Sequence, residues 1–331
     1  MADRDKTYGI ELPQLGMGCW SFAGGQYWGN QSVDDSIRTV HAALDHGVTL
    51  FDTSENYADD HHSEEVLGIA LAGRREEALI ATKVATGNLR KDDVIAACQA
   101  SLERLSTDYI DLYQIHWPNR DVPIAETCDA ITHLLERGLI RSFGVCNFGP
   151  IDLDELLGVR RPVSNQMPYN LLWRGVEQEV VPTLEEEDIG LMCYSPLAQG
   201  LLAGRYMSAD EVTGGLKSSR VLSADLEPEG HDIPGLAESV FSAVRLVIQL
   251  SSELGVPAAG LAAQWLLSQP MVRTVLVGAR RPEEIVSMVQ AVGSGGAELA
   301  TALGKLSDGT ADLKAMRTNN LDMWTVPGRM R

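Results

Sequence analysis

The sequence lacks three features that would restrict its class. No long apolar run occurs among its 331 residues, so we expect no membrane-spanning segment. The five cysteines are odd in number and form no Cys-x-x-Cys pair, which favours free thiols in a reducing compartment. Basic residues are scarce, with 27 Lys and Arg against 46 Asp and Glu, and this argues against a nucleic-acid partner. The polar N-terminus resembles no secretion signal, so we expect a cytoplasmic protein.

The pattern that is present alternates between strands and helices. Short β-branched runs are followed by helical patterns about eight times, which is the number of units in a (β/α)8 TIM barrel. A composition of 44% hydrophobic and 22% charged residues is typical of a globular domain. We therefore predict one α/β barrel domain, with these further parts: an N-terminal β-hairpin over residues 6–15, one helix over 176–187, a long loop at about 203–235 and a C-terminal tail at about 293–331.

Three consecutive predicted strands end on ionisable side chains. The first ends on Asp52, the second runs into Lys83 and the third runs into His116, while Tyr57 follows Asp52 by one short loop. Parallel barrel strands open at their C-terminal ends onto one face, which is where such folds carry out chemistry. We therefore predict that these four side chains form a catalytic site.

The four residue types favour proton transfer to an oxygen atom. A phenol normally loses its proton near pH ~10, and we expect a buried Lys83 ammonium to lower the pKa of Tyr57. Asp52 would keep that ammonium charged, and His116 would hold a substrate oxygen. The sequence contains neither a nucleophile elbow nor a set of metal ligands, so we expect no metal. A proton donor of this kind suits carbonyl reduction by a hydride cofactor.

From Leu15 to about Val292 the chain resembles the aldo-keto reductase family. The resemblance is carried by these motifs: Phe51-Asp52-Thr53 with Tyr57, Ala81-Thr82-Lys83, Asp111–Pro118, Gly144–Phe148, Asn165-Gln166, and Tyr194–Leu197 with Gly200–Arg205. It implies a nicotinamide cofactor across the barrel mouth, usually NADP, with NAD as the alternative. It also implies that Tyr57 is the general acid or base for an aldehyde, ketone or sugar carbonyl.

The resemblance further implies the contacts of the nicotinamide and the pyrophosphate. Asn147 and Gln166 would hold the carboxamide, and Tyr194 would stack on the nicotinamide ring. The pyrophosphate would follow the residues after this tyrosine, namely Ser195, Leu197, Gly200, Leu201 and Arg205.

The 2'-phosphate of NADP would bind at the turn that contains Gly278 and Arg280. Here the chain departs from many relatives, because Glu284 would set a carboxylate near that phosphate and repel it. Trp20 lies where the family lines its substrate pocket, and Trp117 is a second candidate.

Two alternative functions stay open. The family's barrel also serves as the β subunit of potassium channels, a cofactor-binding regulatory partner with weak turnover. An NAD-dependent sugar dehydrogenase is the other alternative, and Glu284 favours it. The sequence identifies neither the small-molecule substrate nor the oligomeric state.

Overall fold

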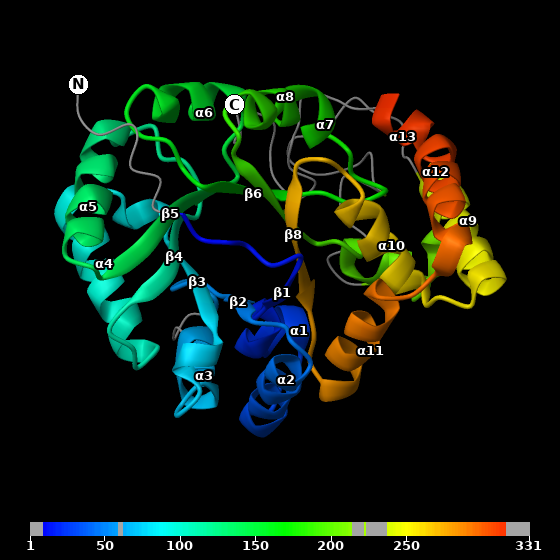
Figure 1. Ribbon diagram of the computed structural model, residues 1–331, viewed down its shortest axis with the longest axis horizontal. Coiled ribbons are helices and arrows are strands. Elements are labelled where there is room, and N and C mark those ends of the chain that lie inside the picture. The colour runs from blue at the N-terminus through cyan, green and yellow to red at the C-terminus, as the bar shows by residue number, and fades with distance from the viewer. Residues whose placement is uncertain (1–8, 59–61, 214–221, 223–236, 316–331) are drawn as a thin grey trace.

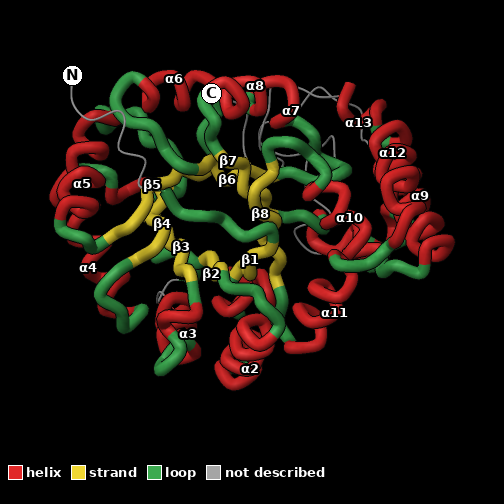
Figure 2. Tube along the Cα trace, in the orientation of Figure 1, coloured by secondary structure: helices red, strands yellow, loops and turns green. Residues whose placement is uncertain are grey.

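Eight parallel strands form a closed barrel in the computed structural model, which describes residues 9–58, 62–213, 222 and 237–315. The strands follow one another in sequence order, and the last pairs with the first (Figures 1 and 2). They are β1 (Leu15–Gly18), β2 (Leu50–Asp52), β3 (Leu79–Val84), β4 (Ile110–Ile115), β5 (Ile140–Cys146), β6 (Ser164–Pro168), β7 (Gly190–Tyr194) and β8 (Val272–Gly278). The predicted (β/α)8 barrel is confirmed.

Helices surround the barrel as an outer layer (Figure 2). Those between β1 and β6 are α1 (Gly25–Trp28), α2 (Val33–Asp45), α3 (His62–Ala70), α4 (Lys91–Arg104), α5 (Ile124–Glu136) and α6 (Pro150–Leu157). Those after β6 are α7 (Val176–Glu179), α8 (Val181–Glu186), α9 (Ala237–Leu254), α10 (Ala258–Leu267), α11 (Pro282–Val292), α12 (Leu299–Gly309) and α13 (Ala311–Ala315). Ser32 caps α2 as the sequence predicts, since its side chain accepts the Asp35 N–H.

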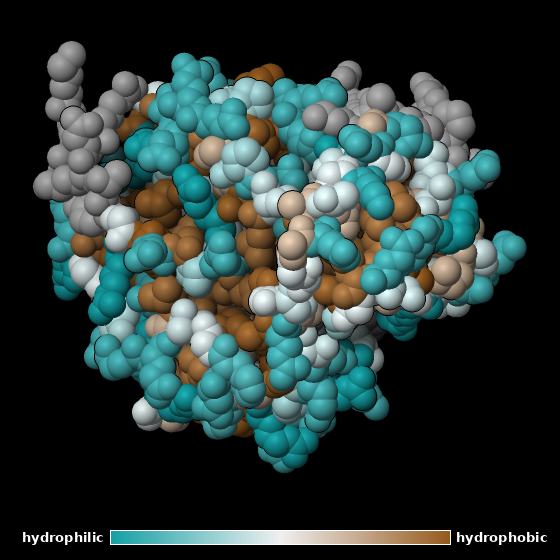
Figure 3. Space-filling model, turned by 45° about the vertical axis from the view of Figure 1, so that its right-hand side comes forward, coloured by the Kyte–Doolittle hydropathy of each residue, from teal (hydrophilic) through white to brown (hydrophobic). Residues whose placement is uncertain are grey.

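Apolar side chains fill the lower part of the barrel. The inner cluster consists of Leu50, Ala81, Leu112, Met192 and Leu276, all buried. Alternate residues of a strand point to opposite faces, so the polar residues that end these strands lie above this cluster. The periphery of the face in Figure 3 is mostly hydrophilic, with apolar side chains visible towards its middle.

The predicted N-terminal hairpin is not formed by the residues that the structure describes. Residues 6–8 lie outside the described residues, and residues 9–14 contain no strand. Ile10 and Leu12 instead pack against the inner cluster, and Thr274 Oγ1 donates a hydrogen bond to the Pro13 carbonyl at 2.7 Å. Residues 9–14 thus pack against the inner cluster and form no strand pair with one another.

The helix predicted over residues 176–187 is two helices. Val180 separates α7 from α8, and Pro182 lies in the first turn of α8, where its missing N–H costs no hydrogen bond. The predicted tail is described only as far as residue 315, and this part is more regular than expected, since it contains α12, which packs against α9 (Figure 1). Of the predicted long loop, residues 203–213 and 222 are described, and they include a 3-10 turn at Ala209–Glu211.

Among the described helices, none is by itself long and apolar enough to cross a membrane. Only α9 and α10 together reach the required length and composition, and they are bent by 101° to each other. Most of α10 is buried against the rest of the fold.

Candidate functional site

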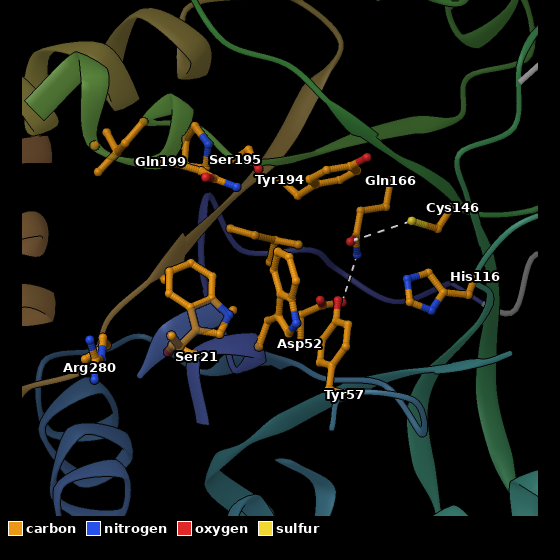
Figure 4. Close-up of a pocket in the computed structure, with 18 of the residues that line it drawn as sticks. Ser21, Asp52, Tyr57, His116, Cys146, Gln166, Tyr194, Ser195, Gln199 and Arg280 are labelled. Carbon is orange, nitrogen blue, oxygen red and sulfur yellow. Dashed lines mark hydrogen bonds between the residues drawn. The ribbon is translucent and has the colours of Figure 1, made fainter. Parts of the chain in front are cut away.

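A cavity of about 610 Å³ opens at the C-terminal ends of the strands. The terminal residues of five strands line it, namely Gly18, Asp52, Cys146, Tyr194 and Gly278, together with Gln166 near the end of β6. Figure 4 shows Asp52, Tyr57, His116 and Gln166 around its floor, with Tyr194 and Ser195 above them. Parallel strands in a closed barrel bring these segments together although they are far apart in sequence.

Lys83 lies beneath the cavity floor and is fully buried. Its Nζ atom is 2.6 Å from Asp52 Oδ1, 2.8 Å from the Thr53 carbonyl oxygen and 3.1 Å from the Tyr57 hydroxyl. An ammonium group has three hydrogens to donate, and these three acceptors satisfy them all. The predicted chain from carboxylate through ammonium to phenol is therefore formed.

The pKa values of this chain differ from the sequence-based expectation. Burial has the largest effect on Tyr57 and raises its pKa, the Lys83 ammonium lowers it, and the net pKa lies above the ordinary value. The expected effect of Lys83 is therefore confirmed in direction, but the expected net lowering of the Tyr57 pKa is wrong because burial outweighs it. Burial alone would lower the pKa of Lys83, but Asp52 and Tyr57 raise it above its usual range. The phenol thus keeps its proton at neutral pH while Lys83 stays charged.

Both oxygens of Asp52 accept hydrogen bonds. Oδ1 accepts from Lys83, while Oδ2 accepts from Gln166 Nε2 at 2.8 Å and from Gln114 Nε2 at 3.2 Å. Gln166, expected to hold a carboxamide, is thereby fixed on the cavity floor, and the Cys146 thiol lies 3.8 Å from its Oε1 atom (Figure 4). Three side-chain donors, all of them buried, thus hold this carboxylate in place.

His116 follows β4 and its ring lies beside the phenol. The ring centroids of His116 and Tyr57 are 5.8 Å apart in an edge-to-face arrangement. The backbone N–H of His116 donates to the Val84 carbonyl at 3.0 Å, and Asn147 Nδ2 donates to the His116 carbonyl at 3.0 Å. Its Nδ1 atom is 3.1 Å from Ser54 Oγ. The backbone bonds on both sides hold the ring at the cavity.

The residues after β7 form the upper wall. Tyr194 donates its hydroxyl hydrogen to Asn147 Oδ1 at 2.9 Å, and Ser195 has a positive φ of 53°. Arg205 lines the cavity and stacks on the ring of Tyr206. It has no carboxylate partner among the described residues, so its charge is available to an anionic ligand.

The turn after β8 has an arrangement that the sequence did not predict. The Arg280 guanidinium donates to Gln31 Oε1 at 2.9 Å and to the Asn30 carbonyl at 2.6 Å. Glu284 accepts the Arg280 backbone N–H at 2.7 Å and pairs with Arg281 at 3.1 Å. The carboxylate thus occupies the N-terminal end of α11, where an anion would otherwise be favoured.

Aromatic side chains form the remaining wall. Trp20 and Trp28 meet edge to face with centroids 5.3 Å apart, and Trp20 lies 6.0 Å from the Tyr57 ring. Trp117 also lines the cavity. Flat apolar surfaces next to a phenol and an imidazole can hold a carbon skeleton while its oxygen reaches the polar floor.

Of the predicted site residues, Lys83 and Leu201 do not line the cavity, because both are fully buried behind it. The other fifteen predicted catalytic, cofactor and substrate residues all line the cavity. Sequence reasoning missed Asn56, which lies in a turn, and Gln199, which lies in a short 3-10 segment, because neither position has a distinctive pattern. Among the described residues, no three His, Cys, Asp or Glu side chains are placed to hold a metal ion.

Comparison with known proteins gives consistent matches. A model of the Aldo/keto reductase family matches residues 14–294. The aldo-keto reductase YhdN of Bacillus subtilis (strain 168) is 35% identical over 304 residues, 86% of each chain. A probable voltage-gated potassium channel subunit beta of Arabidopsis thaliana is 30% identical over 302 residues, 86% of this chain and 88% of that protein. An aldo/keto reductase from Klebsiella pneumoniae in complex with NADP and acetate has a TM-score of 0.72 at 25% identity, covering 95% of both chains.

Proposed function

The chain belongs to the aldo-keto reductase family, whose members are NAD(P)H-dependent oxidoreductases, and we propose that it interconverts an aldehyde, ketone or sugar carbonyl with its alcohol, using NADP(H). The observation that carries this proposal is the position of Lys83 Nζ, 2.6 Å from Asp52 Oδ1 and 3.1 Å from the Tyr57 hydroxyl. A buried ammonium stabilises negative charge on an oxygen next to it. That stabilisation is needed where a phenol gives up a proton.

The cavity residues fit a dinucleotide cofactor. Arg205 offers its guanidinium to the pyrophosphate, and Asn147 and Tyr194 offer an amide and a ring to the nicotinamide. A Cβ atom added at Gly278 would meet no atom within 4 Å, so this strand end leaves space for a ligand. The bound cofactor would supply the hydride, and a relative that binds NADP supports this assignment.

The side chains of this chain would then act on the carbonyl oxygen. Tyr57 would donate its proton to that oxygen, since its raised pKa keeps the phenol protonated at neutral pH. Lys83 would stabilise the resulting phenolate, and Asp52 would keep Lys83 charged. His116 would fix the oxygen beside the phenol, and Trp20 with Trp117 would hold the rest of the substrate and limit the access of water.

An absorbance assay with both cofactors tests the proposal. Aldehydes, ketones and aldoses are offered with NADPH or NADH, and alcohols with NADP or NAD. We expect turnover of at least one class of substrate, with a kcat of about 1 per second or more, the lower end of the usual enzymatic range. If the chain binds the cofactor but turns over no member of the panel, the proposal is wrong.

A regulatory role is the second candidate, because a probable potassium channel subunit beta is among the relatives. The same assay separates the two, since a regulator of that kind needs the cofactor site but not rapid turnover. Tight cofactor binding with only a few turnovers per hour would favour the regulator.

A further inference from the structure

Ser54 lies next to the imidazole of His116. It follows Asp52 and Thr53 in the loop after β2 and is completely buried. Its Oγ atom is 3.1 Å from His116 Nδ1, 2.6 Å from Asn56 Oδ1 and 3.5 Å from the Lys83 carbonyl oxygen. One hydroxyl group therefore connects a ring nitrogen of the site with a side-chain amide at the cavity edge.

The loop holds this hydroxyl in place. The backbone N–H of Thr53 donates to the Ala81 carbonyl at 2.8 Å, which continues the strand pairing past the end of β2. On the other side of Ser54, Glu55 Oε1 accepts the Ala85 N–H at 2.6 Å and the Asn88 amide at 3.1 Å. Both neighbours are thus fixed to β3 and to the loop after it, so Ser54 cannot easily turn away from the ring.

The count of hydrogens decides how the ring is protonated. A serine hydroxyl has one hydrogen and can donate to only one acceptor. The nearest acceptor is Asn56 Oδ1 at 2.6 Å, and it takes this hydrogen. The Ser54 oxygen then presents lone pairs to His116 Nδ1, so a favourable contact at 3.1 Å requires a hydrogen on Nδ1.

We propose that Ser54 is a positioning residue that holds neutral His116 as the Nδ1–H tautomer, with Asn56 setting the direction of the Ser54 hydroxyl. The hydrogen bond made by one ring nitrogen commonly fixes the state of the other. Nε2 of the neutral ring then accepts a hydrogen bond and donates one only when the ring is charged. Resting on the proposed function, this makes charged His116 a donor to a carbonyl oxygen and neutral His116 an acceptor for an alcohol.

Nitrogen NMR of the protein labelled with 15N-histidine tests the tautomer without requiring turnover. The His116 signals are assigned with a His116→Gln variant, and spectra are taken at about pH 9, where an ordinary imidazole is neutral. We expect Nδ1 to carry the hydrogen in the native protein. A native ring that carries it on Nε2 overturns the proposal, whether or not the chain is a reductase.

Three variants connect that result to Ser54 and Asn56. Ser54→Ala removes the acceptor and should shift the ring towards the Nε2–H form, whereas Ser54→Thr keeps a hydroxyl and should retain the native spectrum. Asn56→Asp can only accept a hydrogen, so it should also retain the native tautomer. A changed tautomer in Asn56→Asp, or an unchanged one in Ser54→Ala, contradicts the assignment.

The pH dependence of kcat/KM for carbonyl reduction gives a second readout. The titratable groups of the neighbouring elements include Asp52, Glu55, Tyr57, Lys83 and Cys146, and all five are present in every variant. Native enzyme should lose about tenfold in kcat/KM per pH unit once the ring loses its charge, whereas Ser54→Ala should lose less than about threefold. The Ser54→Thr variant should follow the native profile. Parallel profiles for the native protein and Ser54→Ala would mean that Ser54 only fills space.

Discussion

Asp52 joins the acid–base residues to the floor of the cavity, because its two oxygens accept from three buried side chains. Lys83 is bound to one oxygen, and Gln114 and Gln166 are bound to the other. The Lys83 ammonium is fully buried, so Asp52 is the charge that compensates it. The consequence is that the site's electrostatics and the stability of the barrel depend on the same carboxylate.

Replacing Asp52 by asparagine should therefore destabilise the fold. The change leaves a buried ammonium without its counter-ion, and we expect the free energy of unfolding to fall by about 3–5 kcal/mol. Urea denaturation measures it. Asp45→Asn is the matched control, because Asp45 pairs with Arg74 on the surface and its loss should cost less than about 1 kcal/mol. Equal losses in the two variants would contradict a compensating role for Asp52.

We expect Glu284 to limit how well the turn after β8 accepts a phosphate. Its carboxylate accepts the Arg280 N–H and pairs with Arg281, so a 2'-phosphate bound at this turn would meet a negative charge. We expect Glu284→Gln to tighten NADPH binding by about tenfold and to leave NADH almost unchanged. Quenching of tryptophan fluorescence on titration with each cofactor measures both affinities.

The neighbouring Glu283 provides the control for that experiment. Glu283→Gln removes the same charge from the same helix end, but this side chain does not line the cavity. It should change NADPH affinity by less than about twofold, as expected for a screened surface charge. If both variants tighten NADPH equally, the effect comes from net charge and not from the position of Glu284.

Among individual residues, those whose type and position in the chain are both distinctive could be predicted from the sequence. Asp52, Lys83 and His116 follow predicted strands, so their meeting could be inferred. Gln114 could also have been found, since it lies two residues before His116 and so shares its face of the strand. The partners of Arg280 could not, because Asn30 and Gln31 lie some 250 residues away in a loop without a pattern.

Helix packing around the barrel depends on small residues at particular contacts. Gly260 of α10 lies against Ala291 of α11, and a Cβ atom added at Gly260 would lie 2.2 Å from the Ala291 Cβ atom. Gly260→Ala should therefore push the two helices apart and destabilise the fold by about 1–3 kcal/mol. The melting temperature measures the effect.

A second glycine in the outer layer provides the control. Gly304 lies within α12, and a Cβ atom added there would meet nothing within 4 Å. Gly304→Ala should stabilise the fold by about 0.5–1 kcal/mol, because alanine is the better helix former. The two substitutions are chemically the same, so opposite signs would show that the contact at Gly260 decides the result. A destabilising Gly304→Ala would contradict this reading of the packing.

The order of the elements could be predicted, but some of their ends and contacts could not. Each strand–helix unit has its own local pattern, which is why the barrel was predicted. The break between α7 and α8 follows from Pro182, a local signal that could have been used. The attachment of α12 has no such signal, since Arg174 and Trp265 bond to Ser307 from distant parts of the chain.

The stability of the whole molecule should fall at alkaline pH. The pKa values of Lys83 and Tyr57 are raised in the folded protein, so both groups keep protons that the unfolded chain releases. Their contribution is complete below the ordinary values near pH ~10 and is lost as the pH rises through the folded values. Urea unfolding between about pH 9 and pH 11 should show a decline that is less steep in Tyr57→Phe. An equally steep decline in that variant would contradict the raised Tyr57 pKa.

The barrel as a whole brings residues that are distant in the sequence together at one site. The central claim is that Tyr57 gives its proton to a carbonyl oxygen at this site. The most direct test is the oxidation of bound NADPH by a carbonyl substrate in a single turnover. Stopped-flow absorbance measures it in the native protein and in Tyr57→Phe. We expect the variant to bind NADPH with unchanged affinity and to lose about 10²–10⁴-fold in the rate of the chemical step. A variant that oxidises NADPH at the native rate would contradict the account.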